Sequence, residues 1–312
     1  METGPGDTAG GGELTHTAFY SCESTGQAGW IPVGDIRLPI DDLGFRQAVT
    51  AVERLRTYRG VLFQAPRHLA RLAGTLAAIG LESAFGDVRW AVLLDELIER
   101  NRDWIESQGD VGVTIWATPG SHRATRPTYA LHLNRIDPVV ASQRRELGQT
   151  VVLTDVQQPS PACWSRQAKV RSRLHYYLAD QQAGAIHPGA TGVLCDTDGS
   201  WTESGIANLG LVIGDEILLP PLSQVLGGIT QSFAIECAER LGIAIRHQNL
   251  STADIARADA MLLMGTDCGI WYANQVFQVG GTSVVAFPVP REDSVVRRLQ
   301  REMPESEIPQ KL

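Results

Sequence analysis

The sequence predicts a mixed α/β protein built from two domains. Its 312 residues exceed what one compact core usually holds. Hydrophobic residues make up 43% of the chain and charged residues 20%, which is typical of a globular protein. Helix and strand patterns alternate irregularly with hairpin turns, which argues against a doubly wound βαβ series. No Gly-x-Gly-x-x-Gly motif follows a strand, so a dinucleotide-binding fold is not expected.

The first unit is predicted to be rich in strands. Alternating apolar residues over Val49–Tyr58 lead through a turn at Arg59 and Gly60 into Val61–Phe63, which predicts a hairpin. Apolar residues at helical spacing predict a helix over 67–79 and another over 87–100 with Asp87 as its N-cap. Further strands are expected at 31–39, 111–117 and 128–134.

The second unit mixes both element types. Strands are expected at 150–155, 192–196, 209–213, 216–219, 243–247 and 260–264, and helices at 170–184, 230–241 and 252–258. The polar segment 137–148 contains Pro138 and is the best candidate linker. The predicted domains are therefore 22–136 and 149–290, with a flexible tail at 1–21 and a charged tail at 291–312.

Charge and cysteine content exclude several classes of function. The net charge of -8 disfavours nucleic acid as a partner, and no apolar run approaches the roughly 20 residues that span a membrane. The five cysteines have neither disulfide nor zinc spacing, so no metal site is expected and a reduced cytoplasm is the simplest location. The tail at 1–21 has neither the basic nor the apolar region of a secretory signal.

Lysine is almost absent from this chain. Only Lys169 and Lys311 are lysines among 27 basic residues, so arginine supplies nearly all positive charge. Arginine cannot form an imine or act as a nucleophile, and a mid-chain lysine is therefore a candidate for amine chemistry. The alternative is that codon bias removed the other lysines and Lys169 survived by chance.

Five segments together resemble the fold-type-IV enzymes that use pyridoxal 5′-phosphate (PLP). These are Phe63 with His68–Leu72, Ala168–Leu174, Asp198–Asn208, Leu226–Thr230 and Met264–Thr266. The family, the class IV aminotransferases, includes branched-chain and D-amino acid aminotransferases and aminodeoxychorismate lyase. The resemblance covers about residues 39–279 and implies the two-domain fold of D-amino acid aminotransferase.

The resemblance assigns a role to each matched residue. Lys169 would carry PLP as a Schiff base and move protons during catalysis, and Glu203 would pair with the pyridine nitrogen. Arg71 would supply a cation for the phosphate, with Asn208 bracing the loop after Glu203. Backbone and hydroxyl groups of Gly228, Ile229, Thr230 and Thr266 would complete the phosphate site.

Arg173 lies four residues after Lys169, one turn along the predicted helix. It could face the cofactor or remain a charge on the helix surface.

The substrate end matches the family less well. Gln47 and Val52 stand where aromatic residues are expected in the pocket wall that begins at Phe45, Ala48 replaces a usual glycine, and Gln231 replaces a usual arginine. His122, Arg123 and Arg126 follow the turn at Gly120 and are candidates to bind the substrate carboxylate. The alternative is three surface residues on a polar loop.

The leading hypothesis is an aminotransferase that acts between an amino acid, branched-chain-like, and a 2-oxo acid. The first alternative is 4-amino-4-deoxychorismate lyase, which is disfavoured because Glu53 stands where lyase members prefer threonine. The second is a degenerate PLP-binding protein without turnover. The resemblance further implies a homodimer in which a loop of the partner borders each site.

Overall fold

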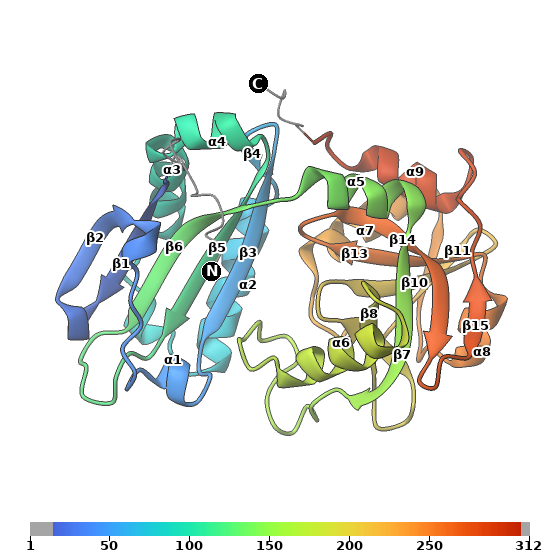
Figure 1. Cartoon of the computed structure of the whole chain (residues 1–312), viewed down its shortest axis with the longest axis horizontal. Coiled ribbons are helices and arrows are strands. Elements are labelled where there is room, and N and C mark those ends of the chain that lie inside the picture. Colours follow the sequence, from blue (N-terminus) through green and yellow to red (C-terminus); the bar gives the residue numbers. More distant parts are fainter. Residues whose placement is uncertain (1–14, 307–312) are drawn as a thin grey trace, which may run out of the picture.

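The computed structural model describes residues 15–306. Two β-sheets, each with its own helices and its own core, form two domains that lie side by side (Figure 1). The mixed α/β fold with two domains that the sequence predicts is therefore confirmed.

The small domain contains an antiparallel sheet of six strands in the order β2-β1-β6-β5-β3-β4. Its strands are β1 Thr17–Cys22, β2 Gln27–Pro32, β3 Ala51–Tyr58, β4 Val61–Leu62, β5 Val111–Thr118 and β6 Thr128–Arg135. Its helices are α1 Leu43–Arg46, α2 Ala65–Ala78, α3 Trp90–Arg100 and α4 Arg102–Gln108.

Strand β3 is buried along both faces. One face packs in the core of the small domain, and the other faces a cavity between the two domains. Leu55 points into the core with Leu72 and Leu76 of α2. Because side chains alternate along a strand, Val52 and Arg54 point the other way, toward the large domain.

The large domain contains nine strands in the order β12-β11-β10-β13-β14-β7-β8-β9, with β15 beside β14. Its strands are β7 Gln149–Gln157, β8 Thr191–Cys195, β9 Trp201–Ser204, β10 Asn208–Ile213, β11 Glu216–Leu219, β12 Ala244–His247, β13 Ala260–Gly265, β14 Gly269–Gln278 and β15 Ser283–Ala286. A further pairing of β9 with β10, Glu203 opposite Asn208, closes six of these strands into a ring. Its helices are α5 Pro138–Leu147, α6 Leu174–Ile186, α7 Ile229–Arg240, α8 Thr252–Arg257 and α9 Val295–Glu302.

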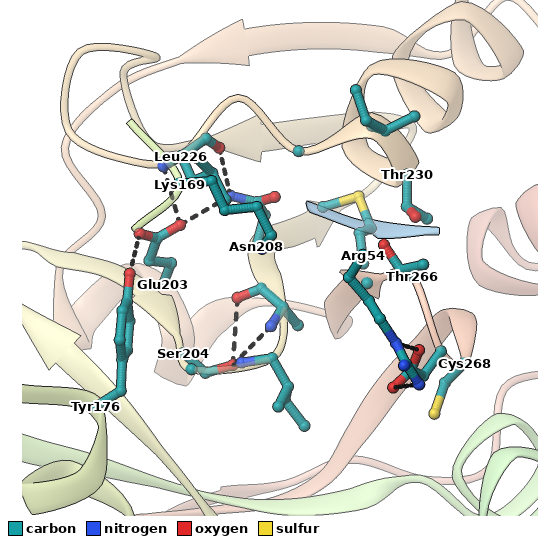
Figure 2. Close-up of a pocket in the computed structure, with 18 of the residues that line it drawn as sticks. Arg54, Lys169, Tyr176, Glu203, Ser204, Asn208, Leu226, Thr230, Thr266 and Cys268 are labelled. Carbon is teal, nitrogen blue, oxygen red and sulfur yellow. Dashed lines mark hydrogen bonds and ion pairs between the residues drawn. The ribbon is translucent and has the colours of Figure 1, made fainter. Parts of the chain in front are cut away.

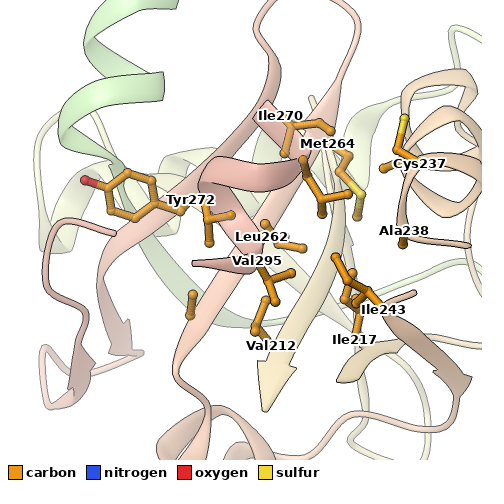
Figure 3. Close-up of a cluster of buried hydrophobic side chains, with 14 of the residues drawn as sticks. Val212, Ile217, Cys237, Ala238, Ile243, Leu262, Met264, Ile270, Tyr272 and Val295 are labelled. Carbon is orange, nitrogen blue, oxygen red and sulfur yellow. The ribbon is translucent and has the colours of Figure 1, made fainter. Parts of the chain in front are cut away.

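An apolar cluster packs α7 and α9 against β13, next to a cavity between the two domains. It joins Cys237 and Ala238 of α7 and Val295 of α9 to Leu262 and Met264 of β13 (Figure 3). Met264 also lines the cavity between the domains. Because packed interiors yield little, the first turn of α7 and the end of β13 are held in fixed positions beside that cavity.

A short backbone pairing joins the Lys169 segment to the small domain. The Val52 N–H donates to the Lys169 carbonyl at 2.9 Å, and the Arg171 N–H donates to the Thr50 carbonyl at 3.0 Å. The Lys169 N–H donates to Thr75 Oγ1 of α2 at 3.1 Å. These bonds hold residues 169–171 extended, so the helix expected from residue 170 begins only at Leu174.

Regular elements occupy parts of the expected tails and linker, which corrects those boundaries. Strand β1, Thr17–Cys22, begins within the expected tail at 1–21, whose first 14 residues are outside the described part of the chain. Helix α5 fills the expected linker because Asp137 caps it, accepting hydrogen bonds from the Val139 and Val140 N–H groups, and Pro138 takes its first position. Helix α9 lies in the tail expected from residue 291, of which residues 307–312, with Lys311, are not described.

Two smaller expectations about element ends are also wrong. Helix α3 begins at Trp90 with no side-chain cap, so Asp87 is not its N-cap. The strand expected at 31–39 is instead β2, which ends at Pro32 and is followed by a 3₁₀ turn over Val33–Asp35.

Within residues 15–306, no helix combines the length and apolar character needed to span a membrane. The same residues contain no cluster of three or more His, Cys, Asp or Glu side chains suited to a metal ion.

The contact between α6 and β8 gives a test of packing. A Cβ added at Gly192 would overlap the backbone of Ala179 and lie 2.9 Å from the Ala179 Cβ. We expect Gly192→Ala to lower the free energy of unfolding by about 1–3 kcal/mol, measured by chemical denaturation, because the helix must shift.

Gly184→Ala is the matched control. Gly184 lies in α6, the helix that also contains Ala179, and an added Cβ at Gly184 would have nothing within 4 Å. It should stabilise the protein by about 0.5–1 kcal/mol. Equal effects of the two substitutions would contradict the packing shown here.

Candidate active site

A cavity of about 410 Å³ lies between the two domains. All nine residues that the sequence assigns to the cofactor line it: Arg71, Lys169, Arg173, Glu203, Asn208, Gly228, Ile229, Thr230 and Thr266. They come from α2, the extended segment after β7, the start of α6, strands β9 and β10, the first turn of α7 and the turn after β13 (Figure 2). Distant parts of the chain therefore converge on one site.

Lys169 enters this cavity from an extended segment rather than from a helix. Burial, together with the positive charge of Arg71, lowers the pKa of its ammonium from 10.5 to about 8. At pH 7 about a tenth of the side chain is therefore the neutral amine, far more than for an ordinary lysine, and the neutral amine is the form that attacks a carbonyl carbon.

Glu203 is buried and surrounded by donors. Its carboxylate accepts hydrogen bonds from Tyr176 Oη at 2.7 Å, the Leu226 N–H at 3.0 Å and Asn208 Nδ2 at 3.1 Å (Figure 2). It also accepts one from Gln158 Nε2 at 2.9 Å. Burial raises the pKa of Glu203, although these hydrogen bonds act in the opposite direction. A cationic N–H brought next to this carboxylate would supply the counter-charge that burial makes favourable.

The first turn of α7 forms an anion cradle. Gly228 is its N-cap, so the N–H groups of Ile229 and Thr230 begin the helix without partners inside it. A Cβ at Gly228 would overlap Asn208 Oδ1, and one at Gly265 would overlap the Ile206 carbonyl, so only glycine fits at either position. The hydroxyls of Thr230 and Thr266 line the same cavity.

Arg71 is held by a buried acid that sequence reasoning did not place in the site. Its guanidinium donates to Glu53 through Nε at 2.9 Å and Nη2 at 2.6 Å, and through Nη1 to the Gly227 carbonyl at 2.8 Å. His68 Nδ1 lies 3.0 Å from the same carboxylate. Burial alone would raise the pKa of Glu53, but His68 and Arg71 lower it to about 2. An acid within an apolar strand, ahead of a His-x-x-Arg helix, is the sequence signal that could have identified it.

Arg173 lies at the start of α6, not one helical turn beyond Lys169. Its guanidinium donates to the Gly205 carbonyl and lies over the Tyr176 ring, 4.5 Å from the centroid. It therefore joins the Glu203 loop to the ring that donates to Glu203. Tyr176 and Gln158 are not predicted from the sequence. Each bonds Glu203 from 27 or 45 residues away, and no local pattern marks a contact at that separation.

Two departures from the family pattern have structural counterparts. Ala48, in place of a usual glycine, has a φ of 55°, a left-handed conformation that disfavours any residue with a Cβ. Its carbonyl accepts a hydrogen bond from Ser172 Oγ at 3.2 Å, close to the Lys169 segment. Gln231 is buried, and its Nε2 has no hydrogen-bond partner among residues 15–306.

Phe45, His122 and Arg123, which are predicted together with Arg126 to contact substrate, do not line the cavity of this chain, and Arg126 does not line it either. His122 and Arg123 are exposed on the loop between β5 and β6, and Phe45 is 66% exposed on α1. The loop and the helix are neighbours, because the Leu43 N–H donates to the Gly120 carbonyl at 3.0 Å. The three side chains thus share one surface region, and their role in substrate binding stays a prediction.

Comparison with known proteins places this architecture in a family. The model of "Amino-transferase class IV" matches residues 50–276. D-alanine aminotransferase of Bacillus licheniformis is 23% identical, with 73% of this chain and 78% of that protein aligned. A probable branched-chain-amino-acid aminotransferase of Rickettsia typhi is 22% identical, with 76% and 81% aligned.

Solved structures show the same fold. Branched-chain amino acid aminotransferase of Escherichia coli superposes with a TM-score of 0.74 at 20% identity, covering 92% of this chain and 93% of that one. A hypothetical aminotransferase of Mycobacterium tuberculosis, bound to α-ketoglutarate and PMP, gives 0.75 at 16% identity, covering 92% and 99%. With the family model matching well over half of its length, this chain belongs to the class IV aminotransferases.

Proposed function

We propose that this protein transfers an amino group between an amino acid and a 2-oxo acid with Lys169 as its catalytic residue. Class IV aminotransferases use pyridoxal 5′-phosphate. The observation that carries the proposal is a lysine of lowered pKa that shares one cavity with a buried carboxylate and an anion cradle.

The donor set of the cavity fits PLP at each of its functional groups. The cradle of Ile229 and Thr230, the hydroxyl of Thr266 and the cation of Arg71 would hold the phosphate. Glu203 would accept the pyridinium N–H, and Lys169 would hold the carbonyl carbon covalently. The glycines at 228 and 265 leave the room that this group requires.

Bound PLP supplies an electron sink that makes the substrate Cα proton acidic. The residues of the chain do the remaining work. The Lys169 amine would take the proton from the substrate Cα and hold it within the cavity for the later return step. Glu203, fixed by Tyr176 and Asn208, keeps a negative charge opposite the pyridine nitrogen. Glu53 neutralises Arg71 from behind and so limits the excess positive charge at the phosphate.

A branched-chain-like amino donor is the substrate class we propose. The support is the apolar side chains of Val52, Ile206 and Met264 in the cavity wall and the likeness to proteins named as branched-chain aminotransferases. Each half of transamination must use the same cavity, since there is one Lys169 per chain.

The proposed assembly is a homodimer in the cytoplasm. On α6, Leu174, Tyr177 and Leu178 are 44–69% exposed, and Phe45 is similarly exposed on α1. Contiguous exposed apolar side chains of this kind favour a protein interface. In a dimer, His122 and Arg123 of the partner subunit would be available to border the site. All five cysteines are free, which suits a reducing compartment.

Half-reactions test the central proposal. The purified holoenzyme is mixed with single amino acids, branched-chain, acidic and D-configured, and its absorbance should shift from the lysine-linked form toward the pyridoxamine form with a branched-chain donor. Lys169→Ala should lack both the visible band and turnover, because no other lysine is present among the described residues.

Absence of a shift with every donor would rule out the aminotransferase. Formation of pyruvate from aminodeoxychorismate would establish the lyase instead. Retention of band and turnover by Lys169→Ala would remove Lys169 from the mechanism.

The pH dependence of cofactor uptake tests the lowered pKa of Lys169. Since the neutral amine reacts, the rate at which apoenzyme acquires the visible band should rise with pH and level off above about pH 8, the pKa of Lys169. Stopped-flow absorbance measures it. A rate still climbing tenfold per unit at pH 9–10 would show that the pKa is not lowered.

Light scattering tests the assembly. At micromolar concentration we expect the mass of two chains, each of 33.9 kDa. Replacing Tyr177 and Leu178 by serine should shift the mass toward one chain, because the exposed apolar face is lost. A single-chain mass for the unaltered protein would contradict the dimer.

A further inference from the structure

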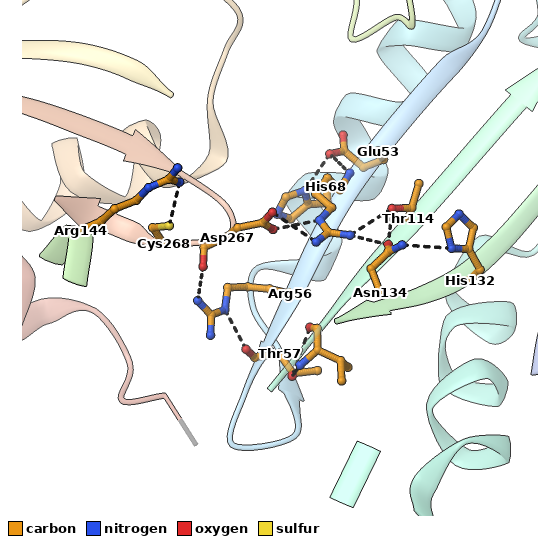
Figure 4. A network of polar contacts seen from close by, with 12 residues as sticks. Glu53, Arg56, Thr57, His68, Thr114, His132, Asn134, Arg144, Asp267 and Cys268 are labelled. Atoms are coloured by element: carbon orange, nitrogen blue, oxygen red, sulfur yellow. Dashed lines mark hydrogen bonds and ion pairs between the residues drawn. The ribbon is translucent and has the colours of Figure 1, made fainter. Parts of the chain in front are cut away.

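An ion pair crosses the cavity at the end away from Glu203. Arg54 of β3 donates through Nε to Asp267 Oδ1 at 2.9 Å and through Nη2 to Oδ2 at 3.2 Å. Asp267 lies in the turn between β13 and β14, next to Thr266 of the phosphate site. Figure 4 shows it reaching from the large domain toward the strands of the small domain. Both residues line the cavity that contains Lys169.

Arg54 is fixed independently of Asp267. Its Nη1 donates to Thr114 Oγ1 at 3.2 Å and to Asn134 Oδ1, and Thr114 itself donates to Asn134 at 2.6 Å (Figure 4). A Cβ at Gly112 would overlap the guanidinium, so the glycine makes room for it. Strands β5 and β6 thus hold the cation in place, and its side chain is only 23% exposed.

The carboxylate of Asp267 has no comparable support, although the Asp267 backbone carbonyl accepts a hydrogen bond from Arg56 Nη1 at 2.7 Å. Among the described residues, its carboxylate accepts hydrogen bonds from Arg54 alone, and its side chain is 50% exposed. A carboxylate in this position regains water when it leaves its partner, and such exposed pairs contribute only about 0–1 kcal/mol. The pair can therefore open by rotation of the Asp267 side chain, while the Asp267 backbone and Arg54 stay in place.

The rest of this cavity is rich in cations. Arg144, Arg171 and Arg173 line it, and none of the three forms an ion pair with a carboxylate within the described residues. Burial and the charges of Arg173 and Arg54 lower the pKa of Arg171, so the guanidinium groups act on one another. An excess of positive charge favours a ligand that carries more than one anionic group.

We propose that Asp267 is an exchangeable counter-ion for Arg54. It pairs with Arg54 when the substrate side chain is uncharged and gives way when a substrate brings a second carboxylate. The inference rests on the proposed function, in which a branched-chain-like amino donor and a 2-oxo acid use one cavity in turn, and it adds that the 2-oxo acid carries a second carboxylate. Without Asp267, the Arg54 guanidinium would disfavour an uncharged substrate side chain at this point of the wall, and without Arg54 the second carboxylate would have no partner there.

Unreactive ligands test this exchange without requiring turnover. Dissociation constants of the holoenzyme are measured by calorimetry for glutarate, with two carboxylates, and isocaproate, with one carboxylate and a branched apolar end. Arg54→Gln should weaken glutarate about tenfold or more, because a charge-assisted bond is lost, and change isocaproate less than about twofold. Asp267→Asn should tighten glutarate by up to about fivefold, because the internal competitor is removed.

The two substitutions are expected to change glutarate affinity in opposite directions, so a general loss of folding cannot explain both results. A variant that folds poorly cannot bind glutarate more tightly, so Asp267→Asn alone can decide if Arg54→Gln is unstable. Arg246→Gln is the matched control, since it removes an arginine from a surface ion pair with Glu216 and should alter neither constant.

Three results would overturn the exchange. The first is equal weakening of both ligands by Arg54→Gln, and the second is unchanged glutarate binding in Asp267→Asn. The third is a lowered melting temperature in both variants with the ligand preference unaltered, which would indicate that the Arg54–Asp267 pair only holds the two domains together. If amino acids never shift the cofactor absorbance while the preference for glutarate still follows Arg54 and Asp267, the exchange stands and the aminotransferase proposal fails.

Discussion

The site depends on the backbone pairing between residues 169–171 and the start of β3. Val52 and Thr50 bond the two peptide groups that flank Val170, and α2 adds the Thr75 hydroxyl. The sequence alone predicts that the helix begins at Val170, directly after Lys169, whereas the pairing holds residues 169–171 extended and α6 begins at Leu174. The pairing also makes the small domain a wall of the cavity. One lysine is therefore positioned by the small domain, while Glu203 and the anion cradle belong to the large one.

Buried charge is arranged around this lysine in compensated groups. Glu53 is fully buried and would be costly alone, but Arg71 and His68 make it a local acceptor whose pKa lies far below the usual value. Glu203 has no such cation among its hydrogen-bond partners, and burial raises its pKa. The two acids therefore differ in kind. One completes its charge balance within the chain, and the other is suited to a cationic ligand.

Sequence reasoning predicts the cavity-lining residues that lie in contiguous motifs. Lys169, Glu203 and the Gly228–Thr230 turn were located because spacing within a motif and the rarity of lysine are local properties. The elements it missed follow a different logic. Helix α5 was hidden because Pro138 can mark a linker as well as a first helical position, and β1 because glycine-rich residues precede it. Tyr176, Arg54 and Asp267 act through partners between 27 and 213 residues away, and no spacing rule carries that information.

The closing pair of the large domain's ring lies inside the active site. Glu203 stands opposite Asn208 where β9 meets β10, and these residues bond each other as well as the loop before α7. The pairing that closes the sheet and the Glu203 carboxylate that lines the cavity thus belong to the same residue pair. A ligand that engages Glu203 adds its binding energy to the closure of the ring, so occupancy of the site and cooperativity of folding are thermodynamically linked in this protein.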